Sequence, residues 1–203
     1  MTFDIKTVSL FFQLVAGFLP LVVLIYKKHK FNLEFVFYLS ISFISTLGLI
    51  FSKFYDFNNS LIFYTFQLST IVSLSVFYFR IIKNKNLLYF IVLLFIACIS
   101  SFIIEMIKLG YTEYSLIIEN ITFVFCPIIY FVDLISNDKS TDINSLQIIN
   151  TSILFYKSST FILFYFIISL MHQNLWFIHN FIEGSSKLLI AYAFWKLPKT
   201  SHY

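Results

Sequence analysis

Seven apolar stretches run through almost the whole of this 203-residue chain and are separated by short connecting segments. Roughly 20 predominantly apolar residues are needed for an α-helix to cross the hydrocarbon core of a bilayer. A backbone in hydrocarbon must also satisfy its own hydrogen bonds, which a helix does. We therefore expect an all-α fold, a polytopic seven-transmembrane helix bundle that forms one domain over residues 1–203. The expected crossings cover residues 8–26, 33–52, 60–81, 87–107, 114–135, 149–171 and 175–196.

The lysines and arginines near the ends of these crossings are distributed unevenly. Nine of them accompany the ends of the first, third, fifth and seventh crossings: Lys27, Lys28, Lys30, Arg80, Lys83, Lys85, Lys139, Lys196 and Lys199. Only Lys6, Lys53 and Lys108 lie on the other side. Because positively charged segments are retained in the cytoplasm during insertion, this asymmetry predicts an amino terminus outside the cytoplasm and a carboxyl terminus inside it.

The composition leaves no room for a soluble domain. Hydrophobic residues make up 59% of the chain and charged residues only 12%, a balance far from that of soluble domains. The net charge of +4 is accounted for by the cytoplasmic segments, so nucleic acid is not an expected partner. The basic cluster follows the first crossing, so we expect that crossing to stay as an anchor. Cys98 and Cys126 fall near mid-bilayer, and we interpret them as packing residues.

The seventh crossing carries the most informative polar pattern. Six of its residues recur at steps of three and four and so share one helical face: Trp176, His179, Asn180, Glu183, Ser186 and Lys187. A charged group at mid-bilayer costs about 2.5–3.5 kcal/mol even on a lenient insertion scale, so this face must meet the bundle interior or water. Glu183 and Lys187 are four residues apart and can pair directly. Such a pair either merely holds helices together or belongs to a binding site.

Polar residues from several crossings fall at one depth in the bilayer. With the amino terminus outside, the outer third of the helices contains Gln13, Gln67, Glu119, Asn120, His179, Asn180 and Glu183. This convergence predicts an outward-facing polar pocket for a small polar or anionic ligand. The candidate ligand-binding residues are Gln67, Glu119, Asn120, Trp176, His179, Asn180, Glu183 and Lys187. Lys157 and Lys187 are expected to form the floor, and the alternative for Lys157 is to snorkel toward the cytoplasm.

Other kinds of site fit the sequence less well. A lysine midway along a seventh helix is typical of retinal proteins, but the third crossing has no carboxylate to act as counter-ion. A metal-dependent hydrolase needs several ligands, and only His172 and His179 fall near the expected pocket. An ion path through the buried carboxylates and Lys187 stays open, although the inner half of the bundle is poor in ionisable residues. We therefore expect no enzymatic activity, no cofactor and no metal.

The last two crossings also carry a resemblance. It rests on Phe155, Tyr156, Ser158, Ser159, Thr160 and Phe164 in the sixth, and on Trp176, His179, Asn180, Lys187, Ala191 and Trp195 in the seventh. With these residues the chain resembles a group of small bacterial seven-helix proteins, and also the membrane sensor regions associated with histidine kinases. No ligand residues are established for that group.

The resemblance implies an integral protein of the bacterial cytoplasmic (inner) membrane with a sensory or accessory role. Because the chain ends at Tyr203 without an output domain, we expect it to signal through a separate membrane-associated partner such as a histidine kinase. Two alternatives stay open. The protein could be a transporter or channel subunit, or it could be a structural subunit of a larger membrane complex.

Overall fold

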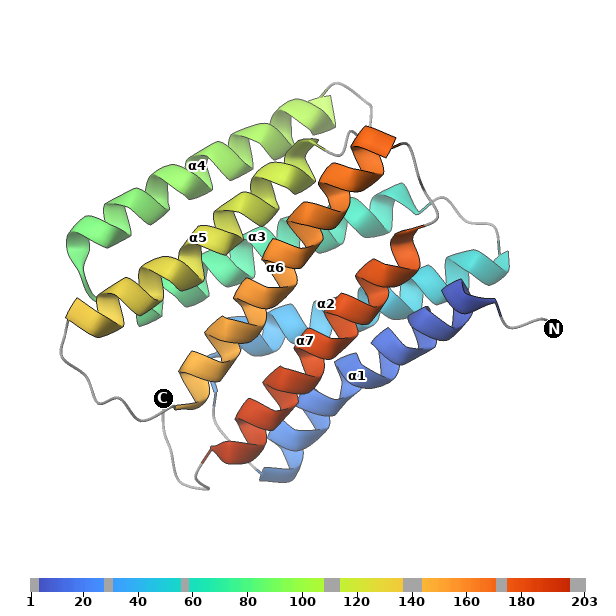
Figure 1. Cartoon of the computed structure of the whole chain (residues 1–203), viewed down its shortest axis with the longest axis horizontal. Helices are drawn as coiled ribbons and strands as arrows, with labels where there is room; N and C mark the ends of the chain where they lie inside the picture. The colour runs from blue at the N-terminus through green and yellow to red at the C-terminus, as the bar shows by residue number, and fades with distance from the viewer. Residues whose placement is uncertain are drawn as a thin grey trace.

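The computed structural model describes residues 4–27, 31–55, 59–107, 114–136, 144–170 and 175–197, with only the backbone described at 54 and 167–170. Within these ranges the chain forms seven α-helices and no β-strand (Figure 1). The helices are α1 (Ile5–Lys27), α2 (Leu33–Tyr55), α3 (Ser60–Ile81), α4 (Lys85–Ile107), α5 (Tyr114–Ser136), α6 (Ser145–Leu170) and α7 (Trp176–Lys196). The all-α prediction is thus confirmed, and every expected boundary lies within four residues of the observed one.

Side-chain caps explain why three helices begin before their apolar stretches. The carboxylate of Asp4 accepts a hydrogen bond of 2.7 Å from the backbone N–H of Thr7, which starts α1. The amide oxygen of Asn84 accepts one of 2.9 Å from the backbone of Asn86 at the start of α4. At the start of α6, Asn144 and Gln147 form a reciprocal capping box with distances of 2.7 and 2.9 Å. These caps satisfy backbone donors that the first turn of a helix leaves unpaired.

Five helices, α1 to α5, are long and apolar enough to cross a membrane by their length and composition. Their outer faces expose large apolar side chains such as Val15, Ile44, Leu93 and Ile135. Within the described residues, α6 and α7 are not among these five helices. The expectation that these two helices also cross a membrane therefore stays a prediction.

Helices α6 and α7 carry many polar residues on the face that points to the interior of the bundle. The buried polar residues of these two helices are Asn150, Ser152, Lys157, Thr160, Asn180, Glu183, Ser186 and Lys187. By contrast, Ile162 and Leu189 expose 55% and 41% of their surface, respectively. A polar inner face beneath an apolar outer face is what hydrocarbon surroundings require of a helix that carries charges.

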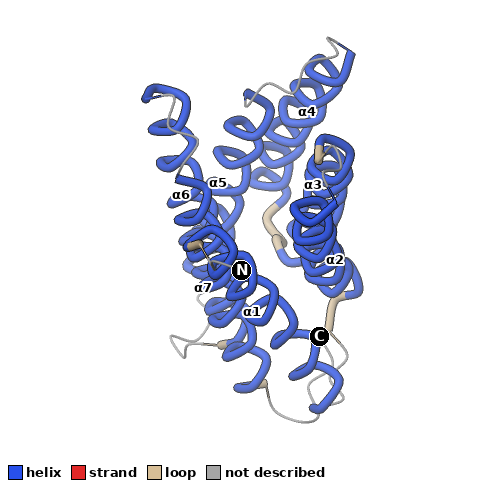
Figure 2. The backbone as a smooth tube through the Cα atoms, turned by 90° about the vertical axis from the view of Figure 1, so that its right-hand side faces the viewer, coloured by secondary structure: helices blue, strands red, loops and turns tan. Residues whose placement is uncertain are grey.

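The helices enclose a space between two groups. Helix α7 packs between α1 and α6, α5 packs between α4 and α6, and α2 packs between α1 and α3. Among the described residues, the backbones of α2 and α3 stay apart from those of α6 and α7. Figure 2 shows α2 and α3 on one side and α6 and α7 on the other. Side chains therefore have to fill or bridge this separation.

An aromatic cluster closes one end of the separation. It consists of Phe31, Phe35, Phe77 and Phe194, from the start of α2 and the ends of α3 and α7. Ring centroids lie 4.9 Å apart for Phe35 and Phe77 and 5.0 Å apart for Phe31 and Phe194. Phe35, Phe77 and Phe194 are fully buried. Close-packed rings of this kind leave no space for water.

Two further features of the packing bear on the sequence predictions. Cys98 and Cys126 are both buried with free thiols, as expected of packing residues. Gly184 lies where α1 and α7 approach each other closely. A Cβ atom added there would sit 2.4 Å from Cε1 of Phe12, so only glycine fits between the α7 backbone and that ring.

Candidate functional site

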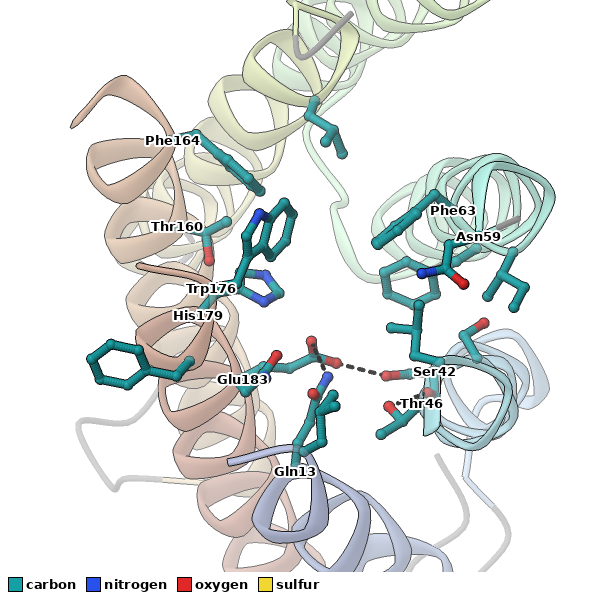
Figure 3. Close-up of a pocket in the computed structure, with 18 of the residues that line it drawn as sticks. Gln13, Ser42, Thr46, Asn59, Phe63, Thr160, Phe164, Trp176, His179 and Glu183 are labelled. Carbon is teal, nitrogen blue, oxygen red and sulfur yellow. Dashed lines mark hydrogen bonds between the residues drawn. The ribbon is translucent and has the colours of Figure 1, made fainter. Parts of the chain in front are cut away.

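A cavity of about 740 Å³ lies between α2 and α3 on one side and α6 and α7 on the other. Its rim includes Lys6, Lys53 and Asn59, at the ends of α1, α2 and α3 that lie farthest from the aromatic cluster. From there it reaches polar side chains near the middle of the helices (Figure 3). Its volume is in the range of ordinary small-molecule sites.

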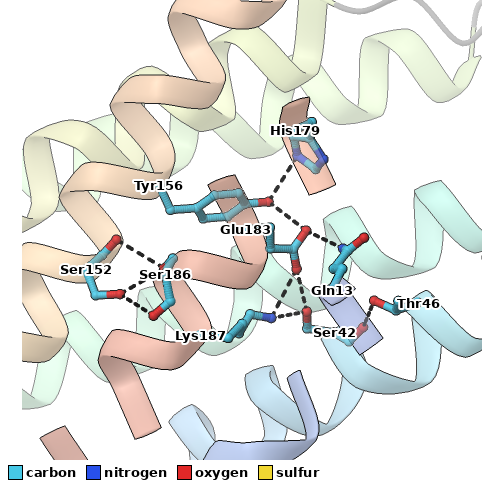
Figure 4. A network of polar contacts seen from close by, with 9 residues as sticks. All are labelled: Gln13, Ser42, Thr46, Ser152, Tyr156, His179, Glu183, Ser186 and Lys187. Atoms are coloured by element: carbon cyan, nitrogen blue, oxygen red, sulfur yellow. Dashed lines mark hydrogen bonds and ion pairs between the residues drawn. The ribbon is translucent and has the colours of Figure 1, made fainter. Parts of the chain in front are cut away.

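The carboxylate of Glu183 is the centre of the cavity floor. Its Oε1 accepts hydrogen bonds from Ser42 at 2.8 Å and from Lys187 at 3.0 Å. Its Oε2 accepts hydrogen bonds from Gln13 at 2.7 Å and from Tyr156 at 3.4 Å (Figure 4). One buried carboxylate thereby joins α1, α2, α6 and α7.

Lys187 lies behind Glu183 and does not line the cavity. Its ammonium group pairs with Glu183, as the four-residue spacing predicts, and also donates to the Ser42 hydroxyl. The Lys187 ammonium lies 5.3 Å from the ring centre of Tyr38. Because the side chains of Glu183 and Lys187 are only 3% and 2% exposed, each charge depends on the other for its neutralisation.

A second buried ion pair joins α5 and α6, on the same side of the cavity as α7. Lys157 of α6 contacts Glu119 of α5 at 2.5 Å, and both side chains are 3% exposed. The alternative that Lys157 snorkels toward the cytoplasm is therefore wrong, since its ammonium group stays inside the bundle. Lys157 and Lys187 would repel each other as neighbouring cations, but each lysine is paired with its own glutamate.

Aromatic side chains form the upper wall of the cavity. The ring of Trp176 lies 5.3 Å from Phe164, 5.5 Å from His179 and 6.0 Å from Phe63 across the cavity. His179 is also 3.4 Å from the hydroxyl of Tyr156. Tyr156 thus links the aromatic wall to the carboxylate of Glu183.

Two deeply buried polar atoms of the lining are left without a hydrogen-bond partner. The amide nitrogen of Gln13 donates to Glu183, which fixes the amide oxygen as a free acceptor. No described residue donates to that oxygen, and the hydroxyl of Thr160 also has no partner. Both residues line the cavity and are at least 95% buried. An unpaired buried polar group costs about 1–3 kcal/mol, which a ligand with matching groups would remove.

Six of the eight candidate ligand-binding residues line this cavity: Glu119, Asn120, Trp176, His179, Asn180 and Glu183. Lys187 lies beneath it, as described above. Gln67 lies outside the lining, which differs from the expected convergence of all these residues in one pocket. Its amide donates to Ser115 at 2.9 Å, and the backbone of Ser115 in turn donates to Glu105. Gln67 therefore belongs to a separate polar contact between α3, α4 and α5. The expectation was wrong for this residue because depth in the bilayer does not tell which side of a helix a residue occupies.

The polar side of α2 was not predicted. Ser42, Ser45, Thr46 and Ser52 line the cavity opposite α7. Ser45 and Thr46 follow Ser42 by three and four residues, and Ser52 follows Ser45 by seven, which keeps them on one helical face. The same periodicity argument that identified α7 could have found them, but uncharged hydroxyl residues are common in membrane helices and gave a weaker signal.

Among the residues that the structure describes, no group of three or more His, Cys, Asp or Glu side chains could hold a metal ion. His172, which the sequence placed near the pocket, lies outside the described ranges. No protein-family model, curated protein or solved structure matches this chain. The resemblance to sensor regions of histidine kinases therefore stays a prediction.

Proposed function

We propose that this protein is a sensory or accessory membrane protein that binds a small polar ligand in the cavity and signals through a separate membrane protein. In this proposal all seven helices cross the bacterial cytoplasmic membrane, and the cavity opens to the outside. A histidine kinase is the partner that the sequence resemblance suggests. The observation that carries the proposal is a cavity with a buried charged floor and two unpartnered polar atoms deep in its lining.

The distribution of charge at the two ends of the bundle supports this orientation. The end with the aromatic cluster carries Lys27, Arg80, Lys83, Lys85 and Lys196 among the described residues, whereas the rim of the cavity carries Lys6 and Lys53. The ammonium group of Lys27 lies 4.3 Å from the ring centre of Trp195. Tryptophan and basic residues at one level are typical of a membrane–water interface. The cavity then faces away from the cytoplasm.

The closed inner end favours a receptor over the runner-up, a transporter or channel subunit. At the end of the bundle away from the rim, the buried ring of Phe35 packs against Phe77 and Phe194 with centroids 4.9 and 6.2 Å apart, which favours a closed inner end. Asp133, a buried carboxylate of α5, accepts hydrogen bonds from the backbone N–H groups of Lys83 and Asn84 at 3.0 and 3.1 Å. It holds the connection between α3 and α4 at the far end of the bundle.

The contacts of the floor provide a means of transmission. Glu119 and Lys157 join α5 to α6, the hydroxyls of Ser152 and Ser186 join α6 to α7 at 2.8 Å, and Glu183 joins α7 to α1 and α2. A ligand that contacts the Gln13 amide, or a change in protonation of Glu183 or His179, alters this set of contacts. The packing of α5, α6 and α7 then changes, and the partner responds to this change through its contacts with the cytoplasmic ends of these helices.

Two measurements test the proposal. First, the protein is purified in mild detergent from native membranes to identify its partner. The output of that partner is then compared between wild-type cells and cells that carry Glu183→Gln, Lys187→Met or both. The double variant controls for loss of folding, since it leaves no unpaired charge. Unchanged partner output in all three variants, at unchanged protein levels, would reject the site. Second, robust ion or solute flux by the purified protein in liposomes would favour a transporter.

A further inference from the structure

The charges around the cavity floor cancel one another. Glu119 pairs with Lys157, and Glu183 pairs with Lys187. Each of these four side chains is at most 3% exposed, so neither pair is open to exchange with solvent. A ligand group with a formal charge at this level would have to break one of the two pairs or remain uncompensated, which is unfavourable beside side chains that are almost fully removed from solvent.

The atoms that lack partners require a different kind of group. The amide oxygen of Gln13 can only accept a hydrogen bond, and the hydroxyl of Thr160 can donate or accept one. The two residues come from α1 and α6, on opposite sides of Glu183 (Figure 3). Uncharged O–H groups satisfy both atoms without disturbing the ion pairs.

The upper wall is suited to a flat apolar body. Phe63, Phe164 and Trp176 present rings to the cavity from α3, α6 and α7. Rings in such surroundings favour offset or edge-to-face contact with another aromatic ring. Together with the neutral floor, this wall selects for an aromatic compound rather than for a sugar or an inorganic ion.

We propose that the cavity binds an uncharged aromatic compound with hydroxyl hydrogen-bond donors, of the phenol or hydroquinone class. This inference rests on the proposed function, because it assumes that the cavity is a ligand site. It narrows the class of ligand that the sequence predicts, a small polar or anionic compound, to uncharged compounds. The hydroxyl groups of the ligand lie at the floor near Gln13 and Thr160, and its ring packs against the rings of Phe63 and Trp176.

Three matched fluorinated probes test the ligand class. They are para-trifluoromethylphenol, its methyl ether para-trifluoromethylanisole, and para-trifluoromethylbenzoate. Binding to the full chain in lipid nanodiscs is measured by fluorine NMR line broadening in mildly acidic buffer, with empty nanodiscs to subtract partition into lipid. One lost hydrogen bond corresponds to a roughly 3- to 10-fold weaker affinity. We expect the phenol to bind that much more tightly than the ether and the benzoate.

A pair of threonine variants locates the hydroxyl. Thr160→Val removes the unpartnered hydroxyl of the cavity lining and is expected to weaken phenol binding roughly 3- to 10-fold, with no change for the ether. Thr70→Val is the matched control. Thr70 is also 1% exposed with an unpartnered hydroxyl, but it lies outside the lining, on α3. We expect Thr70→Val to bind all three probes as the wild type does.

This inference would be overturned if the phenol and the ether bind equally, if the benzoate binds more tightly, or if no probe binds. It would also be overturned if Thr160→Val and Thr70→Val have equal effects. The proposed function fails on a different result. It fails if the output of the partner is the same in the Glu183 and Lys187 variants as in the wild type, whichever probe binds. Tight binding of the benzoate together with a response in partner output would therefore reject the neutral ligand and keep the sensory role.

Discussion

Removing one charge of the Glu183–Lys187 pair should destabilise the protein far more than removing both. Glu183 receives hydrogen bonds from four side chains, of which only Lys187 carries a positive charge. In Lys187→Met the carboxylate stays buried without a cation, and in Glu183→Gln the ammonium stays buried without an anion. Leaving one member of a buried pair uncompensated costs about 3–5 kcal/mol.

The double variant should regain most of this loss. With both changes, the amide introduced at position 183 can still bond to Ser42, Gln13 and Tyr156, while the thioether side chain introduced at position 187 fills the volume of the lysine without a charge. We expect a loss of at most about 2 kcal/mol, because replacing a whole buried pair is often close to neutral. The two sites should therefore be coupled by more than about 3 kcal/mol.

The coupling is measured as a double-mutant cycle on the free energy of unfolding. Unfolding is followed by circular dichroism during titration with sodium dodecyl sulfate in mixed micelles. Lys53→Met is the control, because Lys53 and Asp4 form a largely exposed pair, with 39% and 57% of their side chains accessible, and such pairs contribute little. Single effects that add up in the double variant to within about 0.5 kcal/mol would refute the pairing.

Three further perturbations have defined outcomes. Gly184→Ala should lower the free energy of unfolding by about 1–3 kcal/mol, since its Cβ would clash with the ring of Phe12 at 2.4 Å, and unchanged stability in the same titration would contradict the close α1–α7 contact. Phe35→Ala should cost about 3–5 kcal/mol, because this ring is fully buried in the aromatic cluster. The backbone hydrogen bond from Thr7 holds the pKa of the Asp4 carboxyl below its ordinary value of 3.8. The cap therefore stabilises α1 fully at pH values above 3.8, and this stabilisation is lost as the pH falls through the lowered pKa. The protection of the Thr7 amide, measured as its hydrogen-exchange rate relative to an unstructured peptide at the same pH, should then fall at low pH in the wild type and be small at all pH values in Asp4→Ala.

The fold follows from the sequence because each helix is defined by a long local signal. The hydropathy pattern predicted all seven helices. Where the observed first residue of a helix differs from the expected one, capping residues such as Asn144 and Gln147 set the start, because their hydrogen bonds begin the helix before its apolar stretch. Crossing of the membrane by α6 and α7 stays a prediction, since within the described residues only α1 to α5 are long and apolar enough. Both helices carry buried charges, such as Lys157 and Glu183, on the face that points to the core.

The site followed from the sequence only in part, because local periodicity does not determine which helices become neighbours. The spacing of Glu183 and Lys187 predicted their pairing, and the pairing occurs. The third participant, Ser42, comes from a helix 141 residues away in the chain. Gln67 shows the opposite case, in which a polar residue at the expected depth faces Ser115 instead of the cavity.

Access of water to the cavity from outside is tested most directly by cysteine labelling. The native thiols of Cys98 and Cys126 are fully buried and are removed as Cys98→Ala and Cys126→Ala. In that background Thr46→Cys places a thiol in the cavity lining, and Ile44→Cys places one on the outer face of the same helix, where Ile44 is 62% exposed.

Intact cells are treated with a membrane-impermeant methanethiosulfonate reagent. We predict that the thiol at position 46 is modified and that the thiol at position 44, which faces lipid, is not. Modification of both positions, of neither, or of position 46 only after the cells are opened would contradict a hydrated cavity that is reached from outside.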